Sequence, residues 1–482
     1  MFIGLDLGTT NVKALLVTPE GNVAARGSAP VSLYRGPSDA VEQDIEEIWQ
    51  AALKALREVG GHPKAREVRS IGVSSQAGAM QLLEADGAPI GRVISWMDGR
   101  GAPFNRRMEE RLGLDWFRTR MGHGKSAVSI GQCLRLCEEQ PGVLDPPRRI
   151  GFVGDVIVSR LCGRPAHDAT SLSLAMFYNP TLDDADPDLL RELGLQKSQL
   201  PDLLSPRDAA GPLSEDIAKE TSLPESIPVS PAVHDQYAAA LGAGVTAPGA
   251  MMFGAGTAWV LLAVTDRLLP PAELKEYVCR HVAEGLYGRL LSMGNGGSCF
   301  EWTLELVGCS RKSREEIDAL LDSVPAGSDG LLFRPYLAPF QPPGLPAGLR
   351  GGVNGLRLSH TPAHLLRAAL EGLSMDLARH VAMLNESGLS IQRLAMCGGA
   401  VSSAVTPQLI CDAVGLPVSC IMEPEMSAFG AAVIARGLTE PERSLADVGT
   451  SMPVESRLLN PGKNRVTYQA LFEQYLARLK TV

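Results

Sequence analysis

The sequence predicts an α/β protein built from two related lobes. Apolar runs of strand length alternate with amphipathic stretches of helical period, which is the pattern of sheets covered by helices. A hairpin-like stretch at residues 2–17 has a second, shorter copy at residues 254–264, where Gly and Thr again precede an apolar run. Such a copy indicates internal duplication. The 482 residues suffice for two or three domains with full cores.

The rest of the chain is arranged around the first of these hairpins. Strand-like runs at residues 2–7 and 12–17 flank a tight turn formed by Gly8, Thr9 and Thr10. The turn offers backbone N–H groups and two hydroxyls to an anion. We interpret it as a phosphate-binding turn, although an ordinary buried hairpin would show the same short pattern.

Two charged residues lie next to this turn. Asp6 precedes it at a strand end, where a carboxylate could hold a hydrated Mg²⁺ ion against a phosphate group. Lys13 follows one strand later as a counter-charge for the same anion. The residues leave open the alternative that Asp6 only caps the turn.

Further elements follow from residue periodicity and turn chemistry. In the first half we predict a helix over residues 44–57 with Asp44 as its N-cap, and in the second half a long helix over residues 362–385. The other expected elements are strands at 22–31, 68–74, 93–96 and 393–397, a hairpin turn at 84–87, and helices at 406–414 and from about 425.

The middle of the chain has a different character. Residues 106–241 show helical and loop-like patterns, with many prolines between residues 180 and 231. We interpret this part as an insertion that forms one wall of a substrate cleft. A boundary near residues 242–248 then separates an N-terminal lobe, 1–245, from a C-terminal lobe, 246–482.

Composition excludes several classes of protein. The formal net charge of −9 argues against a nucleic-acid surface, and nine scattered cysteines without a Cys-x-x-Cys pair indicate reduced thiols in a cytoplasmic protein. Asp6 interrupts any secretory leader. Residues 237–265 carry no charge, but their glycines and Pro248 favour buried strands over a membrane span.

Two short motifs look functional and are disfavoured. Residues 122–126 read Gly-His-Gly-Lys-Ser, but Thr119 stands where a phosphate-binding P-loop needs its first Gly, and no buried strand precedes it. His360 and His364 have the spacing of zinc ligands, but Pro362 between them indicates a helix start, and no third ligand is evident. A loop near the substrate, and a helix cap with a surface histidine, fit these two motifs better.

Two other stretches have more specific chemistry. Asp235 follows an apolar stretch and opens a helix of small residues, where it could accept a proton from an attacking hydroxyl or could simply be the N-cap. Residues 398–402 read Gly-Gly-Ala-Val-Ser between a strand and a helix, and such a turn lets a ring or a phosphate approach the backbone.

Together these motifs resemble those of the FGGY family of carbohydrate kinases, in particular its xylulokinase-like members, within the actin/hexokinase-like ATPase superfamily. The resemblance runs along nearly the whole chain. Its landmarks, in chain order, are Gly4–Thr10 with Lys13, Glu42–Asp44 with Trp49, Trp96–Arg100, Gly154–Asp155, Asp168–Ser171, His234–Gln236, Gly254–Thr257, Arg350–Gly352, Leu370–Gly372, Gly398–Ser402, and Glu425 with Gly430–Ala432.

The resemblance implies a fold and a reaction. The fold would be two ribonuclease-H-like lobes of the actin/hexokinase type, with mixed sheets around a central cleft, the first binding sugar and the second binding nucleotide. The γ-phosphate of ATP would pass to a sugar hydroxyl with Mg²⁺ present, with Asp235 as the general base and Asp6 positioning the metal. The residues implied for ATP are Gly8, Thr9, Thr10, Lys13, Gly256, Thr257, Gly398, Gly399, Ala400 and Ser402.

The substrate side departs from the family pattern. The resemblance implies sugar contacts at Gln76, Ala77, Gly78, Trp96, Asp98 and Gln236. Where xylulokinase-like members have Met-His and glycerol kinases Arg-Glu, this chain has Ala77 and Gly78, whose side chains are a methyl group and a hydrogen. His123 or Lys125 could supply the missing polar contact. The expected substrate is a ketose such as xylulose, an alditol or a sugar acid, with glycerol disfavoured.

Two alternatives to a kinase remain open at this stage. One is a catalytically degenerate, sugar-sensing ATP-binding protein, which the Ala77–Gly78 departure would suit. The other is an actin- or chaperone-like ATPase, although such a protein has no reason to carry Asp235 or the Trp96-x-Asp98-x-Arg100 turn. A homodimer is an expectation from the family alone.

Overall fold

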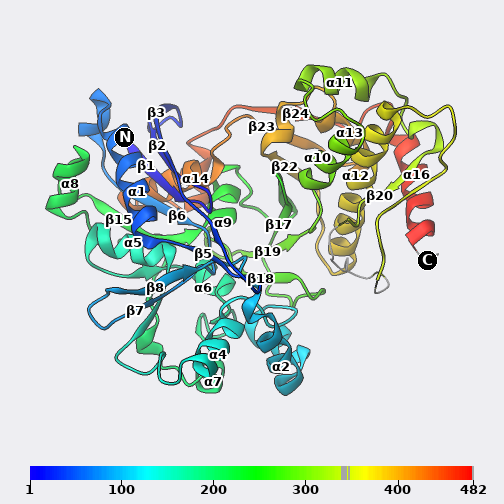
Figure 1. The fold of residues 1–482 in the computed structure, drawn as a ribbon. Helices are drawn as coiled ribbons and strands as arrows, with labels where there is room; N and C mark the ends of the chain where they lie inside the picture. Colours follow the sequence, from blue (N-terminus) through cyan, green and yellow to red (C-terminus); the bar gives the residue numbers. More distant parts are fainter. Residues whose placement is uncertain (338–344, 346–347, 480–482) are drawn as a thin grey trace. The chain divides into compact units, whose positions relative to one another are not determined.

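The computed structural model describes residues 1–337, 345 and 348–479, which divide into two compact units. The first unit contains Met1–Thr246, Asp266–Gly288 and Glu425–Val454, and the second contains the remaining segments between Ala247 and the C-terminus. Asp266–Gly288 and Glu425–Val454 therefore belong to the first unit, whereas a division between residues 245 and 246 would place both in the C-terminal lobe. An α/β fold with mixed sheets is confirmed (Figure 1).

The first unit is built on a mixed sheet with the strand order β13-β10-β15-β6-β1-β2-β3, in which β14 pairs with β15. β1, β6 and β15 run parallel, whereas β1, β2 and β3 form an antiparallel meander. Its strands are β1 (Phe2–Leu7), β2 (Asn11–Val17), β3 (Val23–Pro30), β6 (Ile71–Ser75), β10 (Ala166–His167), β13 (Asp202–Leu203), β14 (Gly211–Pro212) and β15 (Pro228–His234).

A second sheet of this unit has the order β4-β5-β8-β7-β9, and its strands are β4 (Tyr34–Arg35), β5 (Val41–Gln43), β7 (Met80–Leu83), β8 (Pro89–Ile94) and β9 (Arg149–Phe152). β11 (Tyr178–Asn179) pairs with β12 (Asp184–Ala185), and β18 (Glu276–Arg280) also belongs to the unit. The helices are α1 (Ile45–Gly60), α2 (Ala102–Leu112), α3 (Leu114–Trp116), α4 (Ser129–Glu139), α5 (Val153–Cys162), α6 (Ala169–Leu174), α7 (Pro187–Glu192), α8 (Glu215–Thr221), α9 (Asp235–Gly242), α14 (Met426–Thr439) and α15 (Leu445–Thr450).

Most local predictions for this unit are confirmed. The two strands of the first hairpin occur as predicted, and α1 begins after Asp44, whose side chain accepts a hydrogen bond from the Glu46 N–H. The turn at residues 84–87 joins β7 to β8. The strand expected at 93–96 already ends at Ile94, so Trp96 lies in the turn that follows.

Helices cover both faces of the larger sheet. Ile3 and Leu5 of β1 belong to the same apolar core as the buried face of α1, whereas Gly4, which points to the opposite face, lies against α14. A Cβ atom on Gly4 would lie 1.7 Å from the carbonyl oxygen of Ala428. α1 is drawn in blue and α14 in orange in Figure 1.

α14 approaches α9 just as closely, which makes Gly430→Ala strongly destabilising. The added Cβ would lie 1.7 Å from the Ala238 carbonyl oxygen, a backbone atom that cannot move without its helix. We expect a loss of about 3 kcal/mol in the free energy of unfolding, measured with urea. Gly61→Ala is the matched control, because its nearest non-neighbouring atoms lie at 3.6 Å. Equal stabilities of the two variants would contradict this packing.

Residues 106–241 were expected to be mostly helical and loop-like, and this expectation did not include β15, one of several strands in the segment. β15 lies inside the main sheet, between β10 and β6, although it contains two prolines. Pro228 is its first residue, and Pro231 falls where the register with β6 shifts between Val229 and Ala232. Prolines are tolerated at strand starts and bulges. The Val73 N–H beside the bulge donates to the Ser230 hydroxyl.

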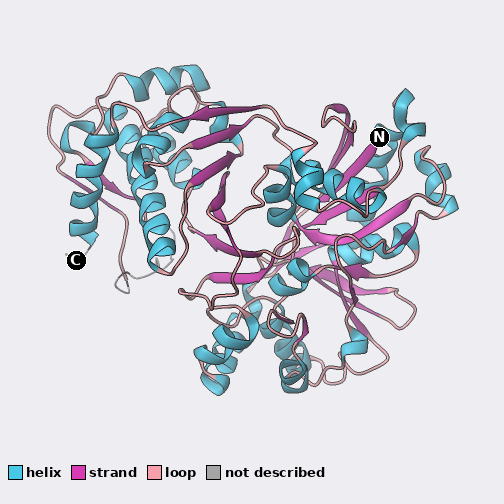
Figure 2. Ribbon diagram, turned by 180° about the vertical axis from the view of Figure 1, so that it is seen from behind, coloured by secondary structure: helices cyan, strands magenta, loops and turns pink. Residues whose placement is uncertain are grey.

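The second unit is built on a mixed sheet in which β19-β17-β16-β22-β23-β24 are successive neighbours. Figure 2 shows its helices gathered on one side of this sheet. The strands are β16 (Ala250–Ala255), β17 (Trp259–Thr265), β19 (Tyr287–Ser292), β20 (Leu332–Arg334), β21 (Gly352–Asn354), β22 (Arg393–Cys397), β23 (Val418–Ile421) and β24 (Ser456–Leu459). The helices are α10 (Gly297–Leu306), α11 (Arg314–Asp322), α12 (Pro362–Glu386), α13 (Thr406–Val414) and α16 (Arg465–Leu479).

Predictions for the second half are also confirmed at the level of elements. β16 and β17 form the second hairpin, and α12, β22 and α13 lie where periodicity placed them. The uncharged stretch 237–265 forms the rest of α9 and these two strands, and no helix within the described residues is both long and apolar enough to cross a membrane. All nine cysteines are free thiols.

The two disfavoured motifs have structural roles. Residues 122–126 form a loop that pairs with β18 through His123 and Tyr277, so they are no P-loop. The ring of His364 accepts the Thr361 N–H at the start of α12, as expected for a helix cap. Within the described part of the chain, no three His, Cys, Asp or Glu residues gather as a metal site.

Candidate active site

The candidate site of the first unit lies at one edge of its larger sheet. Because β1, β6 and β15 are parallel, their carboxyl ends meet there, and Leu7 pairs with Ser75, which pairs in turn with His234. The residues that follow these strand ends therefore come together, namely the Gly8–Thr10 turn, Gln76 and Asp235. Such edges are where open α/β sheets bind ligands.

Asp6 is the buried carboxylate of this edge. It is only 8 % exposed, and the Ser74 hydroxyl donates a 2.7 Å hydrogen bond to its Oδ1 atom. Burial raises the pKa of Asp6 to about 7, and the negative charge of Asp235 acts in the same direction, while the Ser74 hydrogen bond and the charge of Lys13 oppose both. Asp6 and Asp235 are thus close enough to repel each other.

Lys13 is not the counter-charge of Asp6 alone. It lies opposite Asp6 in the β1–β2 pairing, but its ammonium group forms a 2.5 Å ion pair with Glu425 at the start of α14. Asp6 and Asp235 repel each other, and Lys13 is shared between Asp6 and Glu425. The excess negative charge that remains favours a divalent cation at this place. Mg²⁺ is commonly held by one or two carboxylates together with substrate phosphates, so this donor set suits it.

Asp235 does not cap its helix. His234 occupies the N-cap position of α9 without a capping side chain, and Asp235 is the first helical residue. Its side chain is 24 % exposed, and its Oδ1 atom lies 3.1 Å from Nε2 of His234. The N-cap interpretation of Asp235 is therefore wrong, and its carboxylate faces solvent at the sheet edge. Gln236 beside it is half-buried.

A hydrogen-bonded chain joins the first turn to the predicted substrate residues. The Thr9 hydroxyl donates to Oε1 of Gln76 and accepts from the indole N–H of Trp96, at 3.2 Å and 3.1 Å. The side chain of Gln43 donates to the Thr9 carbonyl at 2.9 Å. The Nε2 atom of Gln76 is buried and has no protein partner in the described structure, so a substrate hydroxyl could accept its hydrogen bond. The role of Gln43 was missed, although it lies inside the Glu42–Asp44 landmark.

Asp98 is enclosed by its own turn. Its side chain is fully buried and accepts hydrogen bonds from Arg100, the Val41 N–H and Gln132. Burial would raise its pKa, but the hydrogen bonds from Arg100 and Val41 outweigh burial and lower the pKa of Asp98 below its usual value. In this arrangement Asp98 shapes the turn after Trp96, and its contact with substrate stays a prediction.

The space left by Ala77 and Gly78 is partly filled by another loop. Gly78 has a φ of +76°, and a Cβ atom there would lie 2.8 Å from Cγ1 of Val128. His123, on the same loop, is fully buried with its ring edge-on to Tyr277 at 4.6 Å, and its contact with substrate stays a prediction. Lys125 is partly exposed and stays available.

The second unit has its own candidate site, a cavity of about 510 Å³ beside the second hairpin. Four predicted nucleotide residues line it: Gly256, Thr257, Gly399 and Ala400. Gly398 lies just outside, where its φ of +97° and the Ala255 backbone leave no room for a side chain. Ser403 rather than the exposed Ser402 faces the cavity.

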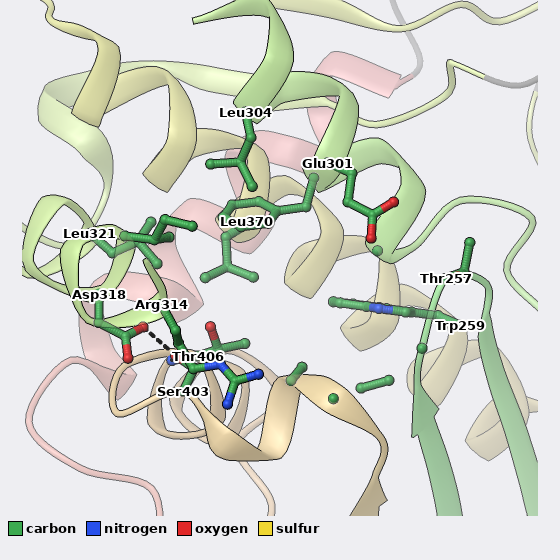
Figure 3. A pocket seen from close by; sticks show the side chains of 17 residues that line it. Thr257, Trp259, Glu301, Leu304, Arg314, Asp318, Leu321, Leu370, Ser403 and Thr406 are labelled. Carbon is green, nitrogen blue, oxygen red and sulfur yellow. Dashed lines mark hydrogen bonds between the residues drawn. The ribbon is translucent and has the colours of Figure 1, made fainter. Parts of the chain in front are cut away.

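The walls of this cavity are mostly apolar, with a polar edge. Figure 3 shows Leu304, Leu321 and Leu370 on one side and Arg314 near Ser403 on the other. Asp318 of α11 accepts hydrogen bonds from the Ser403 hydroxyl at 2.5 Å and the Ala404 N–H at 2.8 Å. These two bonds tie α11 to the turn after β22. No motif marked α11 as a wall, because its contribution depends on tertiary packing.

Asp318→Ala is expected to weaken nucleotide binding. Loss of both hydrogen bonds frees α11 from the turn, so we expect the KM for ATP to rise about tenfold with a smaller change in kcat. Steady-state kinetics against ATP concentration would measure this. Asp322→Ala, the same change at an exposed position of α11, is the control and should leave the KM for ATP unchanged. An unchanged KM for ATP in Asp318→Ala would show that α11 does not contribute to nucleotide binding.

Comparison with known proteins agrees with this geometry. The N-terminal domain of the FGGY family of carbohydrate kinases matches residues 1–242, and its C-terminal domain matches residues 251–436. The chain belongs to the FGGY family of carbohydrate kinases. The two matched domains meet close to the first division between the structural units, between Thr246 and Ala247.

Individual FGGY relatives match along nearly their full lengths. The xylulose kinase of Escherichia coli (strain K12) is 26% identical over 98% of each chain, and the glycerol kinase of Thermus brockianus is 31% identical over 95% of this chain and 93% of its own. The crystal structure of xylulose kinase from Rhodospirillum rubrum superposes with a TM-score of 0.89 and 26% identity, covering 99% of this chain and 98% of that one.

Proposed function

We propose that this protein transfers the γ-phosphoryl group of ATP to a hydroxyl of a small sugar or sugar alcohol. The observation that carries the proposal is the meeting of the Gly8–Thr10 turn, Gln76 and Asp235 at one edge of the first sheet. An anion-binding turn, an amide and an ionisable base are the parts that phosphoryl transfer to an alcohol needs. Membership of the FGGY family supports the same reaction.

Asp235 would act as the general base. Its carboxylate is partly exposed at the start of α9, where an acceptor hydroxyl could reach it. It would accept the proton of the attacking hydroxyl while Gln76 and the partly exposed Trp96 hold the acceptor. Backbone N–H groups and hydroxyls of the Gly8–Thr10 turn would stabilise the charge on the transferring phosphoryl group.

Asp6 would position Mg²⁺. The ion, when bound, neutralises phosphate charge during transfer. Asp6 is held in place by Ser74, and the neighbouring Asp235 adds the second negative charge that makes a cation favourable there. The nucleotide itself would occupy the cavity of the second unit, where the apolar walls suit a base and the Gly256–Thr257 turn suits phosphates.

The acceptor belongs to a narrow set of polyhydroxy compounds. The relatives are named for xylulose and for glycerol, so ketoses and alditols are the first candidates. Sugar acids remain candidates because positively charged side chains would suit their carboxylate. The pairing of His123 with Tyr277 puts Lys125 opposite Lys275, and the loop that carries Lys125 reaches Gly78. We also propose a cytoplasmic location and a homodimer, both as expectations from the family.

A substrate panel tests the proposal. Purified protein with ATP and Mg²⁺ is assayed for ADP release with pentuloses, hexuloses, alditols including glycerol, and aldonates. We expect one class to raise ADP release well above basal hydrolysis. Acceptor binding without any stimulation would instead indicate a sugar sensor. Neither the matched family nor the named relatives favour this alternative or an actin- or chaperone-like ATPase.

A further inference from the structure

A lysine on the loop at residues 122–126 lies opposite a second lysine across a strand pair. The loop runs antiparallel to β18, where His123 pairs with Tyr277. Two residues further along the loop and two residues back along the other strand, this register puts Lys125 opposite Lys275. Both lysines are partly exposed and belong to the first unit.

The two ammonium groups are close enough to repel each other. Burial lowers the pKa of Lys275 to about 8, and the positive charge of Lys125 acts in the same direction. Glu109 of α2 interacts with Lys125, but burial raises the pKa of this carboxyl group and Arg106 shares its charge. A bound anion between the two ammonium groups would offset their repulsion through charge-assisted hydrogen bonds.

The loop that carries Lys125 continues into the proposed acceptor site. Three residues later it reaches Val128, and a Cβ atom on Gly78 would lie 2.8 Å from Cγ1 of Val128 and 3.8 Å from Cβ of Trp96. Val128 has a φ of +44°, which is a strained conformation for a β-branched residue. Strained residues of this kind are concentrated at active sites and ligand-binding loops. The loop therefore packs against the turn that the resemblance assigns to the substrate.

The chemistry of this loop selects a class of acceptor. Ala77 and Gly78 offer the acceptor no polar side chain, and the loop that packs against them brings a cation instead. We propose that Lys125 and Lys275 bind the carboxylate of a sugar acid, so that the preferred acceptor is an aldonate. The carboxylate itself does not react, because the γ-phosphoryl group still passes to a hydroxyl whose proton goes to Asp235. This inference rests on the proposed function.

The charge of the acceptor tests the inference in the wild-type protein. An aldonate and the alditol of the same carbon chain and configuration, such as gluconate and glucitol, differ only in one end group. We expect kcat/KM for the best aldonate of the panel to exceed that for its alditol about 100-fold, because hydrogen bonds between charged groups contribute more than those between neutral groups. Equal values for the two acceptors, or a preference for the alditol, would overturn the proposal.

Substitution of each lysine by methionine tests whether the preference depends on these two residues. Methionine keeps an unbranched chain and removes the charge, so Lys125→Met and Lys275→Met should each raise the KM for the aldonate about 10- to 100-fold. We expect a smaller change in kcat and an unchanged KM for ATP, which shows that the fold is intact. Lys125→Arg keeps the charge and should retain most of the affinity for the aldonate.

Lys54→Met is the matched control, because it makes the same change at an exposed lysine of α1. It should leave the KM for the aldonate unchanged. An unchanged KM for the aldonate in both Lys125→Met and Lys275→Met would overturn the proposal. Equal losses with the aldonate and its alditol would also overturn it, because they would show that the lysines only support the packing of the loop.

Failure of the proposed function would give a different result from failure of this inference. If the protein is not a carbohydrate kinase, no acceptor of the panel stimulates ADP release. If it is a kinase without an anion-binding acceptor site, a ketose or an alditol stimulates ADP release and the aldonates do not. The second result would overturn only the assignment of Lys125 and Lys275.

Discussion

Asp235→Asn is expected to lower kcat for phosphoryl transfer by about 10²- to 10⁴-fold, the range in which positioned general bases contribute. Asparagine has the same shape but cannot accept the hydroxyl proton. Since the carboxylate is partly exposed and forms, among the described residues, no ion pair other than the one with His234, the fold should tolerate the change. Acceptor-stimulated ADP release, with the KM for ATP determined in parallel, measures the effect.

Asp115→Asn is the matched control for this variant. It makes the same chemical change at a carboxylate whose side chain is 93% exposed, and it should leave kcat unchanged. Without acceptor, the rate of basal ATP hydrolysis should fall less in Asp235→Asn than the rate of phosphoryl transfer does. Activation of water depends less on one positioned base than activation of the acceptor hydroxyl. Transfer at the wild-type rate in Asp235→Asn would exclude Asp235 as the base.

Asp6→Asn has the second-largest expected effect on catalysis. The loss of the buried carboxylate removes the proposed Mg²⁺ position, so we expect kcat to fall about 100-fold and the Mg²⁺ concentration for half-maximal activity to rise. Titration of activity with Mg²⁺ at saturating ATP measures both quantities, again with Asp115→Asn as the control. An unchanged Mg²⁺ requirement would place the metal elsewhere.

The same substitution has the opposite effect on stability. Asp6 titrates near its ordinary value of 3.8 in the unfolded chain and at about 7 in the folded protein. The folded state therefore binds this proton more tightly, and the resulting stability is fully present below about pH 4 and is lost as the pH rises through 7. Asparagine does not ionise, so Asp6→Asn should be the more stable protein at about pH 8 in the absence of ligands, by at most about 4 kcal/mol.

Urea unfolding of both proteins near pH 4 and near pH 8, without Mg²⁺ or nucleotide, checks this result. Burial also raises the pKa values of Asp155 and Asp168, to about 8 and about 6. Both proteins contain these two groups, so the difference in stability between wild type and variant reports on Asp6. A wild-type protein that gains stability relative to Asp6→Asn on going from acid to pH 8 would contradict the proposed environment of Asp6. Loss of activity combined with gain in stability is typical of a functional carboxylate.

Features with strong local signals could be predicted from the sequence. The first hairpin, the cap of α1 and the long helix α12 depend on turn residues, capping chemistry and apolar periodicity within one segment. The proposed phosphate turns and the proposed base Asp235 could be singled out because in each case a short motif lies at a strand end. These signals need no knowledge of what packs against the segment.

Features that depend on distant partners could not be predicted. β15 contains two prolines and is a strand only because a bulge at Pro231 lets it pair with β6. The hydrogen bond from Gln132 to Asp98 joins residues 34 positions apart, while the contact of Asp98 with substrate stays a prediction. Asp318 lines the cavity of the second unit only because α11 packs on the turn after β22, and Lys13 forms its ion pair with Glu425 from the other end of the chain.

The most direct test of the account is the stoichiometry of products formed by the wild-type protein. With ATP, Mg²⁺ and the acceptor that gives the highest turnover, mass spectrometry would quantify the phosphorylated acceptor alongside ADP. The account predicts one sugar phosphate for each ADP above the basal rate, and loss of both in Asp235→Asn. ADP formed without phosphorylated acceptor, or no acceptor-dependent ADP across the whole panel, would contradict the assignment as a carbohydrate kinase that transfers phosphate through Asp235.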